Sequence, residues 1–175
     1  MPRGVSRLRW STLREMLSDC ISKVRSECEL FIVQGGRLSV LAKGARDPYT
    51  QAILSINKDI LEVSCRDFPE VLDSEQFKQI ITCLGIGIAT QDERTLSMRS
   101  LRYGKVIVVF DDSIEGKAIR SQVFTFLLTY MMPLIREERV YFSLLGMGSI
   151  DNEFEEKVMN PETRNLARFE PGGYR

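Results

Sequence analysis

The chain has 175 residues, of which 43% are hydrophobic and 27% are charged. This length is enough for one domain with a core of its own, and this composition excludes an intrinsically disordered chain. The 24 lysines and arginines balance 24 aspartates and glutamates, so attraction to an anionic partner has to come from a local patch and not from the net charge.

The first expected element is a helix that begins near Trp10. Apolar side chains recur at helical spacing from Trp10 to Val24, and Thr12 with Glu15 three places on matches a capping box. Two β-rich runs follow, at 28–33 and 37–42, with glycines between them. Because glycine adopts the positive φ of tight turns, we predict that these runs are two strands of a hairpin.

The middle of the chain carries one ambiguous and two clear patterns. Residues 51–65 fit either a short helix or a pair of strands, and we favour strand or mixed structure. A second helix is predicted to begin near Asp73 and Gln76, because apolar residues follow at helical spacing as far as Ile88. The continuous β-branched run at 105–110 predicts a strand that is buried on both faces.

The last third predicts a helix over 119–130 that Pro133 ends or kinks, a strand at 139–145 and a short helix near 151–159. The sequence therefore predicts an α+β fold: a single compact domain with a mixed or antiparallel sheet and two to four packed helices. We divide it into a basic N-terminal arm (1–10), a core domain (11–150) and a polar C-terminal segment (151–175). The predicted core consists of Leu17, Ile21, Phe31, Ile80, Leu84, Val106, Val108, Phe110, Phe126 and Leu127.

Catalytic signals are few in this sequence. The chain has no histidine, which excludes Ser-His and Cys-His nucleophile pairs and the commonest zinc ligand. No G-x-x-x-x-G-K-[ST] phosphate loop occurs either. Asp111 and Asp112 follow an apolar strand, where carboxylates can hold Mg²⁺, but Ser113 and Gly116 after them are typical of a turn and a helix N-cap. We favour the turn, and predict no catalytic residue, no metal and no cofactor.

Basic side chains near aromatic ones are the best binding candidates. Arginine beside an aromatic residue can hold phosphates and stack on bases, or lie at a lipid interface. A solvated edge of strand and loop is the alternative interpretation. The candidate nucleic-acid or lipid-binding residues are Arg3, Arg7, Arg9, Trp10, Arg94, Arg99, Arg102 and Lys105.

Several segments in order resemble the globular core of rhabdovirus matrix proteins, especially the small ones of plant rhabdoviruses. These segments are FIVQGGRLSV, IITCLGIGIA, SLRYGKVIVVFDDS and IREERVYFSLL, which together extend over roughly residues 30 to 145. The resemblance implies a non-enzymatic viral structural protein that self-associates and links ribonucleoprotein to a membrane through a basic N-terminal arm. The chain departs from the animal-virus members in its shorter, less lysine-rich N-terminus.

The partners implied by this resemblance are other copies of the chain, nucleocapsid protein or RNA, and an anionic membrane surface. An intracellular adaptor or a subunit of a larger complex is the alternative function, and an Mg²⁺-dependent enzyme that uses Asp111 and Asp112 is the third. Four scattered cysteines without a C-x-x-C pair favour reduced thiols inside a cell. We therefore expect an intracellular protein in the host cytoplasm or nucleus, and in the virion if it is viral.

Overall fold

The computed structural model describes residues 15–57, 67–86, 97–145 and 154–171. These residues form one six-stranded sheet in the order β1-β3-β2-β4-β5-β6. The four inner strands are parallel and the two short edge strands are antiparallel to them. The strands are β1 (Leu17–Ser18), β2 (Glu29–Gln34), β3 (Gln51–Ile56), β4 (Lys105–Asp111), β5 (Val140–Leu145) and β6 (Ala167–Arg168).

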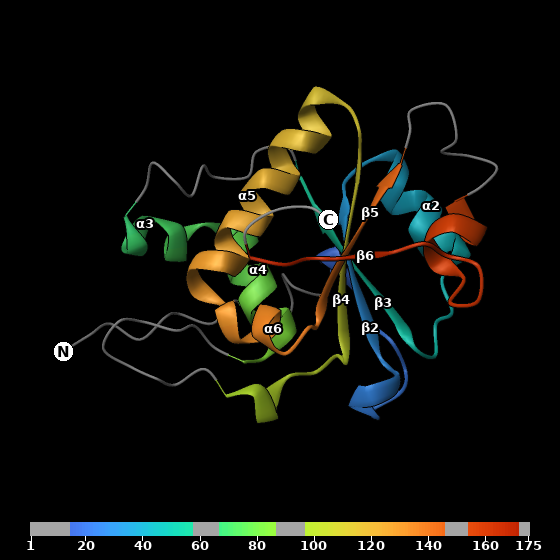
Figure 1. The fold of residues 1–175 in the computed structure, drawn as a ribbon, viewed down its shortest axis with the longest axis horizontal. Helices are drawn as coiled ribbons and strands as arrows, with labels where there is room; N and C mark the ends of the chain where they lie inside the picture. The colour runs from blue at the N-terminus through green and yellow to red at the C-terminus, as the bar shows by residue number, and fades with distance from the viewer. Residues whose placement is uncertain (1–14, 58–66, 87–96, 146–153, 172–175) are drawn as a thin grey trace.

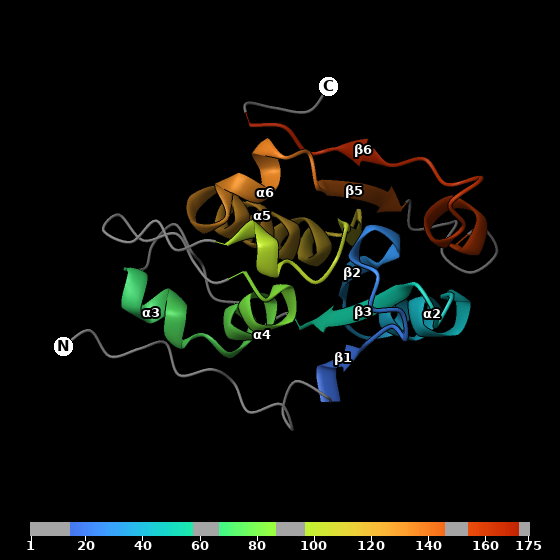
Figure 2. The same ribbon diagram turned by 90° about the horizontal axis from the view of Figure 1, so that it is seen from below.

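Helices cover both faces of this sheet. Helices α4, α5 and α6 lie on one face, and α2 with a helical turn near the C-terminus lies on the other (Figure 1 and Figure 2). Short 3-10 turns occupy Arg25–Glu27 and Met98–Ser100. The helices are α2 (Arg37–Ala45), α3 (Phe68–Asp73), α4 (Glu75–Leu84), α5 (Ile114–Tyr130) and α6 (Met132–Arg136), and the turn is η4 (Glu155–Met159).

Alternating side chains of the inner strands build two apolar clusters, one on each face. Val106 and Val108 of β4 point into the larger cluster, where the rings of Phe77 in α4 and Phe126 in α5 stack at 4.4 Å. Ile107 of the same strand lies in the smaller cluster with α2 and η4. A strand that is buried on both faces needs a continuous apolar run, which is why residues 106–110 lack polar alternation.

The predicted fold class is confirmed: the described residues form a single compact α+β domain with a mixed sheet. The strands predicted at 28–33 and 105–110 are β2 and β4, and the favoured strand within 51–65 is β3. The predicted helices near 73–88 and 119–130 are α4 and α5, with Pro133 in the first turn of α6. The strand at 139–145 is β5, although β6 follows it.

The predicted first helix is wrong from Leu17 to Val24, and its beginning at Trp10 lies outside the described residues. Leu17 pairs with Leu54 of β3, and the backbone N–H of Ile21 donates to the carbonyl of Pro48 at 3.1 Å. These contacts with another part of the chain replace the bonds of a helix. Ile21 is consequently 66% exposed and not a core residue, whereas the other nine predicted core residues are buried.

The predicted hairpin at 28–42 is wrong as well. β2 has a parallel neighbour on each side, so the chain after Gln34 cannot fold straight back and has to cross over the sheet through a helix. The glycine pair is used for this change of direction: Gly36 has φ 75° and is the N-cap of α2. α4 also ends earlier than its pattern suggests, because Gly85 with φ 78° is a left-handed C-cap.

The C-terminal residues are attached to the sheet by a buried ion pair. Glu29 at the start of β2 accepts two hydrogen bonds from Arg164, at 2.7 and 2.5 Å, and a third from Gln51 Nε2 at 3.2 Å. Phe154 is buried in the same region. Burial opposes ionisation of Glu29, but the hydrogen bonds and the charge of Arg164 outweigh it and lower the pKa of Glu29. The boundaries of the three predicted regions stay a prediction.

We predict that Val108→Asp unfolds the domain. Val108 is 0% exposed at the centre of β4, and an unpaired buried carboxylate destabilises a protein by several kcal/mol. Circular-dichroism melts would measure the effect. Val40→Asp is the matched control, because Val40 on α2 is 71% exposed and its replacement should leave the melt nearly unchanged. Equal melts for the two variants would contradict the buried position of β4.

A second prediction concerns Glu29→Gln. Because the folded-state pKa of Glu29 is lowered, its ionised form stabilises the fold at neutral pH, and this stabilisation disappears as the pH falls through that pKa. The variant should lose roughly 3 kcal/mol at pH 7, since it leaves Arg164 as a buried charge without its ionised partner. Its deficit relative to wild type should shrink towards acid pH in thermal melts. The exposed control Glu162→Gln should show no deficit, and a deficit independent of pH would argue against the ion pair.

Candidate functional site

The candidate site lies where the strand order of the sheet reverses. From β2 the chain passes through α2 to β3 on one side, whereas β4 lies on the other side of β2 and leads into α5 on the opposite face. In open sheets with parallel strands, ligands bind outside the carboxyl ends of the strands at such a reversal. The two strands end at Gln34 and Asp111.

A chain of hydrogen bonds connects these two strand ends with the first turn of α5. The Asp111 backbone N–H donates to Gln34 Oε1 at 3.3 Å. Asp111 Oδ1 accepts from the Ser113 backbone N–H at 3.0 Å and from the Ser113 hydroxyl. Ser113 Oγ in turn accepts from the Gly116 N–H at 3.0 Å, which makes Ser113 the N-cap of α5. The side chain of Asp111 is thereby fixed in one orientation.

Gly116 brings α5 into direct contact with both strand ends. A Cβ atom at this position would collide with Asp111 Oδ1, and it would lie 2.5 Å from the Asp111 carbonyl oxygen and 2.9 Å from Gln34 Oε1. Any side chain here would push the helix away. The absence of a side chain therefore lets the first turn of the helix lie directly against these two side-chain oxygens.

The rim of the site carries both acidic side chains and helix N-termini. Asp112 and Glu115 are exposed beside Asp111. The N-termini of α5 and α2 begin next to the ends of β4 and β2, and a helix N-terminus favours a negative group such as a phosphate. The site therefore combines oxygen ligands for a cation with backbone groups suited to an anion.

A magnesium ion fits this arrangement only when it is shared with a ligand. The described residues contain no group of three or more His, Cys, Asp or Glu side chains that could enclose a metal. Mg²⁺, however, is usually bound by one or two carboxylates together with water and substrate phosphates. Asp111 provides such a carboxylate, with Gln34 Oε1 and Ser113 Oγ beside it. The predicted N-cap turn is thus confirmed, and the same turn forms the candidate site.

The basic residues proposed from the sequence lie elsewhere. Arg3, Arg7, Arg9, Trp10 and Arg94 fall outside the described residues. The other three surround the start of β4, at the opposite end of the strand from Asp111. Their role in binding stays a prediction. They are Arg99, which is exposed, Arg102, which is half-buried, and Lys105, which is exposed.

The contacts of Arg102 are structural. Its guanidinium pairs with Asp19 and donates to the carbonyl of Cys83 at 3.2 Å, while the Tyr103 hydroxyl donates to Asp19 Oδ1 at 2.8 Å. Burial opposes ionisation of Asp19, but the hydrogen bond from Tyr103 and the charge of Arg102 lower its pKa overall. This network joins the segment after β1 to the start of β4.

The sequence did not identify Gln34 as part of a site, and it indicated Gly116 only as a residue of the turn after Asp111 and Asp112. The sequence features that could have indicated the site are the polar residues and glycines at the end of each buried strand. They are Gln-Gly-Gly at the end of β2 and Asp-Asp-Ser-x-x-Gly at the end of β4. No pattern in the sequence indicates that the two strands lie next to each other in the sheet. Only their pairing, with Val33 opposite Val109, brings the two signals together.

Comparison with known proteins places this site within a matched region. Residues 29–145, from the start of β2 to the end of β5, match the model of the Toprim domain. The chain is 39% identical over 144 residues to the B subunit of DNA gyrase from Thermotoga maritima, covering 82% of this chain and 22% of that protein. For the same gyrase protein of Rickettsia typhi the identity is 38% over 143 residues, covering 82% and 17%. For that of Cytophaga hutchinsonii it is 34% over 158 residues, covering 90% and 33%. The chain thus spans a third or less of the length of these relatives.

These matches overturn the resemblance to rhabdovirus matrix proteins. They extend over the same residues, and the described parts of the segments that carried the resemblance belong mainly to strands and helices of the core, whose apolar sequences are common to many sheets. The predicted non-enzymatic matrix function and its adaptor alternative are wrong with it. So are the partners predicted with it, namely other copies of the chain, nucleocapsid protein or RNA, and an anionic membrane surface. None of the helices in the described part of the chain has the length and hydropathy of a membrane span.

We predict that Gln34→Glu strengthens Mg²⁺ binding. A second carboxylate beside Asp111 adds charge to the oxygen ligands, and we expect affinity to rise on the order of tenfold. Without the ion the two carboxylates repel each other, so the melting temperature of the variant should fall in EDTA and recover with Mg²⁺. Gln34→Met, which removes the oxygen, should instead weaken Mg²⁺ binding. Calorimetric titration that shows the same Mg²⁺ affinity in both variants would place the ion elsewhere.

Proposed function

Because the chain belongs to the Toprim domain family, we propose that it acts on DNA as part of a gyrase-like DNA topoisomerase. The observation that carries this proposal is Asp111 at the reversal of strand order, held against the N-terminus of α5 by Ser113 and Gly116. The site would engage a phosphodiester group of the DNA backbone. Since the matched relatives are much longer than this chain, we assign it one part of the reaction and not the whole.

The residues of the site suit the demands of phosphoryl transfer. In such reactions the protein contributes mainly by positioning the phosphate and stabilising its charge. Asp111 would hold a Mg²⁺ ion together with a phosphate oxygen, with Gln34 Oε1 and Ser113 Oγ as further oxygens. The ion would stabilise negative charge that develops on the phosphate oxygens. The first turn of α5 would orient the phosphate through its backbone N–H groups.

The proposed partners are DNA and a second protein chain. The matched relatives are named as subunits, which favours a site that engages DNA jointly with another chain. The described residues provide a site with a carboxylate for a cation and helix N-terminal N–H groups for a phosphate. A nucleophile and the remaining DNA contacts would come from outside it.

We predict that Mg²⁺ strengthens binding of duplex DNA to the wild-type chain and that Asp111→Asn abolishes this effect. Ordinarily Mg²⁺ weakens protein–DNA binding, because it competes for the phosphates, so strengthening by Mg²⁺ identifies an ion shared between protein and DNA. The affinity gain should be about tenfold or more, equivalent to at least about 1.4 kcal/mol. Fluorescence anisotropy of a labelled blunt duplex in Mg²⁺ or EDTA at constant ionic strength would measure it.

Two features make this test specific. Asparagine keeps an oxygen that can accept from the Ser113 N–H, so the N-cap turn should persist. The control Asp73→Asn removes an equal charge from a side chain that is 87% exposed at the end of α3, and it should respond to Mg²⁺ like wild type. If Asp111→Asn kept the full Mg²⁺ response, the proposed site would be wrong.

A further inference from the structure

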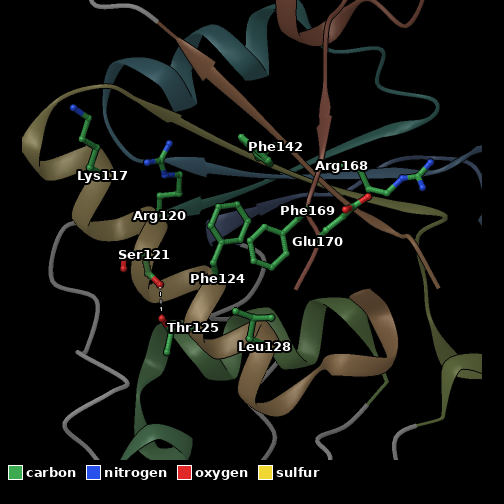
Figure 3. A pocket seen from close by; sticks show the side chains of 10 residues that line it. All are labelled: Lys117, Arg120, Ser121, Phe124, Thr125, Leu128, Phe142, Arg168, Phe169 and Glu170. Carbon is green, nitrogen blue, oxygen red and sulfur yellow. Dashed lines mark hydrogen bonds between the residues drawn. The ribbon is translucent and has the colours of Figure 1, made fainter. Parts of the chain in front are cut away.

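A pocket lies along α5 beyond the candidate site, and no part of the proposed function uses it. It has a volume of ≈ 380 Å³ and lies between α5, β5 and the residues around β6 (Figure 3). Such a volume is within the range of pockets that hold small ligands. It is lined by cations, hydroxyl groups and aromatic rings.

Aromatic rings form the apolar side of this pocket. The rings of Phe124 and Phe169 are stacked at 4.1 Å with an angle of 3° between them, and Phe142 meets Phe124 edge-on at 5.8 Å. Phe124 is buried, whereas Phe169, whose ring lies next to it in Figure 3, is partly exposed. The Phe169 backbone N–H donates to the Val140 carbonyl at 2.9 Å, so the ring is positioned by the sheet. The pocket therefore presents a flat apolar surface.

Charged side chains lie on both sides of these rings. Lys117 and Arg120, one helical turn apart on α5, line one wall, and Arg168 lines the other. Arg168 pairs with Glu138 at 2.8 Å, whereas Lys117 is exposed and forms no salt bridge with an acid in the described part of the chain. Glu170 adds one exposed carboxylate at the rim. The cationic side of the pocket is thus the wall nearest the candidate site.

We propose that this pocket binds one nucleotide, with its phosphate at Lys117 and Arg120 and its base against Phe169. Cations beside an exposed aromatic ring form the usual arrangement for an unpaired nucleotide, because any base has a face that can stack. Glu170 can accept a hydrogen bond from an N–H group on the edge of the base. The neutral net charge of the chain makes such a local patch necessary for any affinity to nucleic acid.

The position of the pocket connects it with the candidate site. Lys117 directly follows Gly116, and the helix rises about 1.5 Å per residue, so Phe124 lies roughly 12 Å along α5 from that glycine. A DNA strand with one phosphate at Asp111 could place a nearby unpaired nucleotide in the pocket. This inference rests on the proposed function for the source of the nucleotide, which is either a DNA strand or a free nucleotide.

The test compares two partial duplexes with the same single-stranded overhang, made either of thymidines or of abasic sites. Anisotropy should show that wild type binds the thymidine overhang at least about fivefold more tightly, since one stacked base contributes this much. Phe169→Leu keeps an apolar contact with Phe124 but loses the flat ring, and the ratio of the two affinities should fall to near one. Lys117→Gln should weaken the binding of both overhangs equally. It should also lower the salt dependence of the binding constant by about the amount that one phosphate contact contributes.

Controls separate this proposal from its alternatives. Lys43→Gln removes an exposed lysine from α2 on the other face of the sheet and should bind both overhangs like wild type. If thymidine monophosphate competes with the thymidine overhang for binding, the pocket is assigned to free nucleotides. If the wild-type ratio of the two overhang affinities is as predicted and thymidine monophosphate does not compete, the pocket is assigned to the DNA strand. A wild-type ratio near one, or an unchanged ratio in Phe169→Leu, overturns the proposal. The Mg²⁺ response on a blunt duplex tests the site at Asp111 and does not involve the ring of Phe169, so failure of the proposed function remains distinguishable.

Discussion

The contact of Gly116 with the carboxyl ends of β2 and β4 determines the rest of the site. Because this residue has no side chain, α5 begins against Asp111 and Gln34, and Ser113 can both cap the helix and hold the Asp111 carboxylate. The direction of α5 follows from the same contact. That direction in turn decides which side chains of the helix face the sheet and which line the neighbouring pocket.

The opposite end of the sheet serves stability. Glu29 and Arg164 form a buried ion pair at the start of β2, and Arg102 with Asp19 joins the segment after β1 to the start of β4. Groups of this kind are costly to leave without their partners, so both networks are satisfied by hydrogen bonds. Polar groups at the carboxyl ends of the strands are partly accessible instead. This division, with structural pairs at one end and the site at the other, agrees with where ligands bind in such sheets.

The two proposed binding functions use different physical interactions along one helix. At its N-terminus, a carboxylate and backbone N–H groups suit a phosphate together with a cation. Two turns later, the stacked rings of Phe124 and Phe169 suit a base, and Lys117 lies between the two places. Because the chain is neutral overall, neither place could attract nucleic acid by a general field. Affinity has to arise from these local contacts.

The sequence by itself determined the elements whose patterns are strong over many residues. The β-branched run of β4 and the apolar spacing of α5 predict a buried strand and a packed helix, and both are confirmed with their core residues. Ser113 as the N-cap of α5 was also readable, because capping depends on residues within one turn. Helix capping is a local property of the sequence. The burial of a strand or helix face is visible directly in the spacing of its apolar residues.

Only the tertiary structure decided how the elements are paired, and with it the site. The glycines after β2 allow a hairpin as well as a turn into α2; the parallel neighbours on both sides of β2 select the turn. In the same way, hydrogen bonds to Pro48 and Tyr49 override the helical pattern between Leu17 and Val24. Gln34 and Asp111 lie far apart in the sequence and meet because β2 and β4 are adjacent in the sheet. Strand order depends on contacts across the whole chain, which a pattern within one segment does not contain.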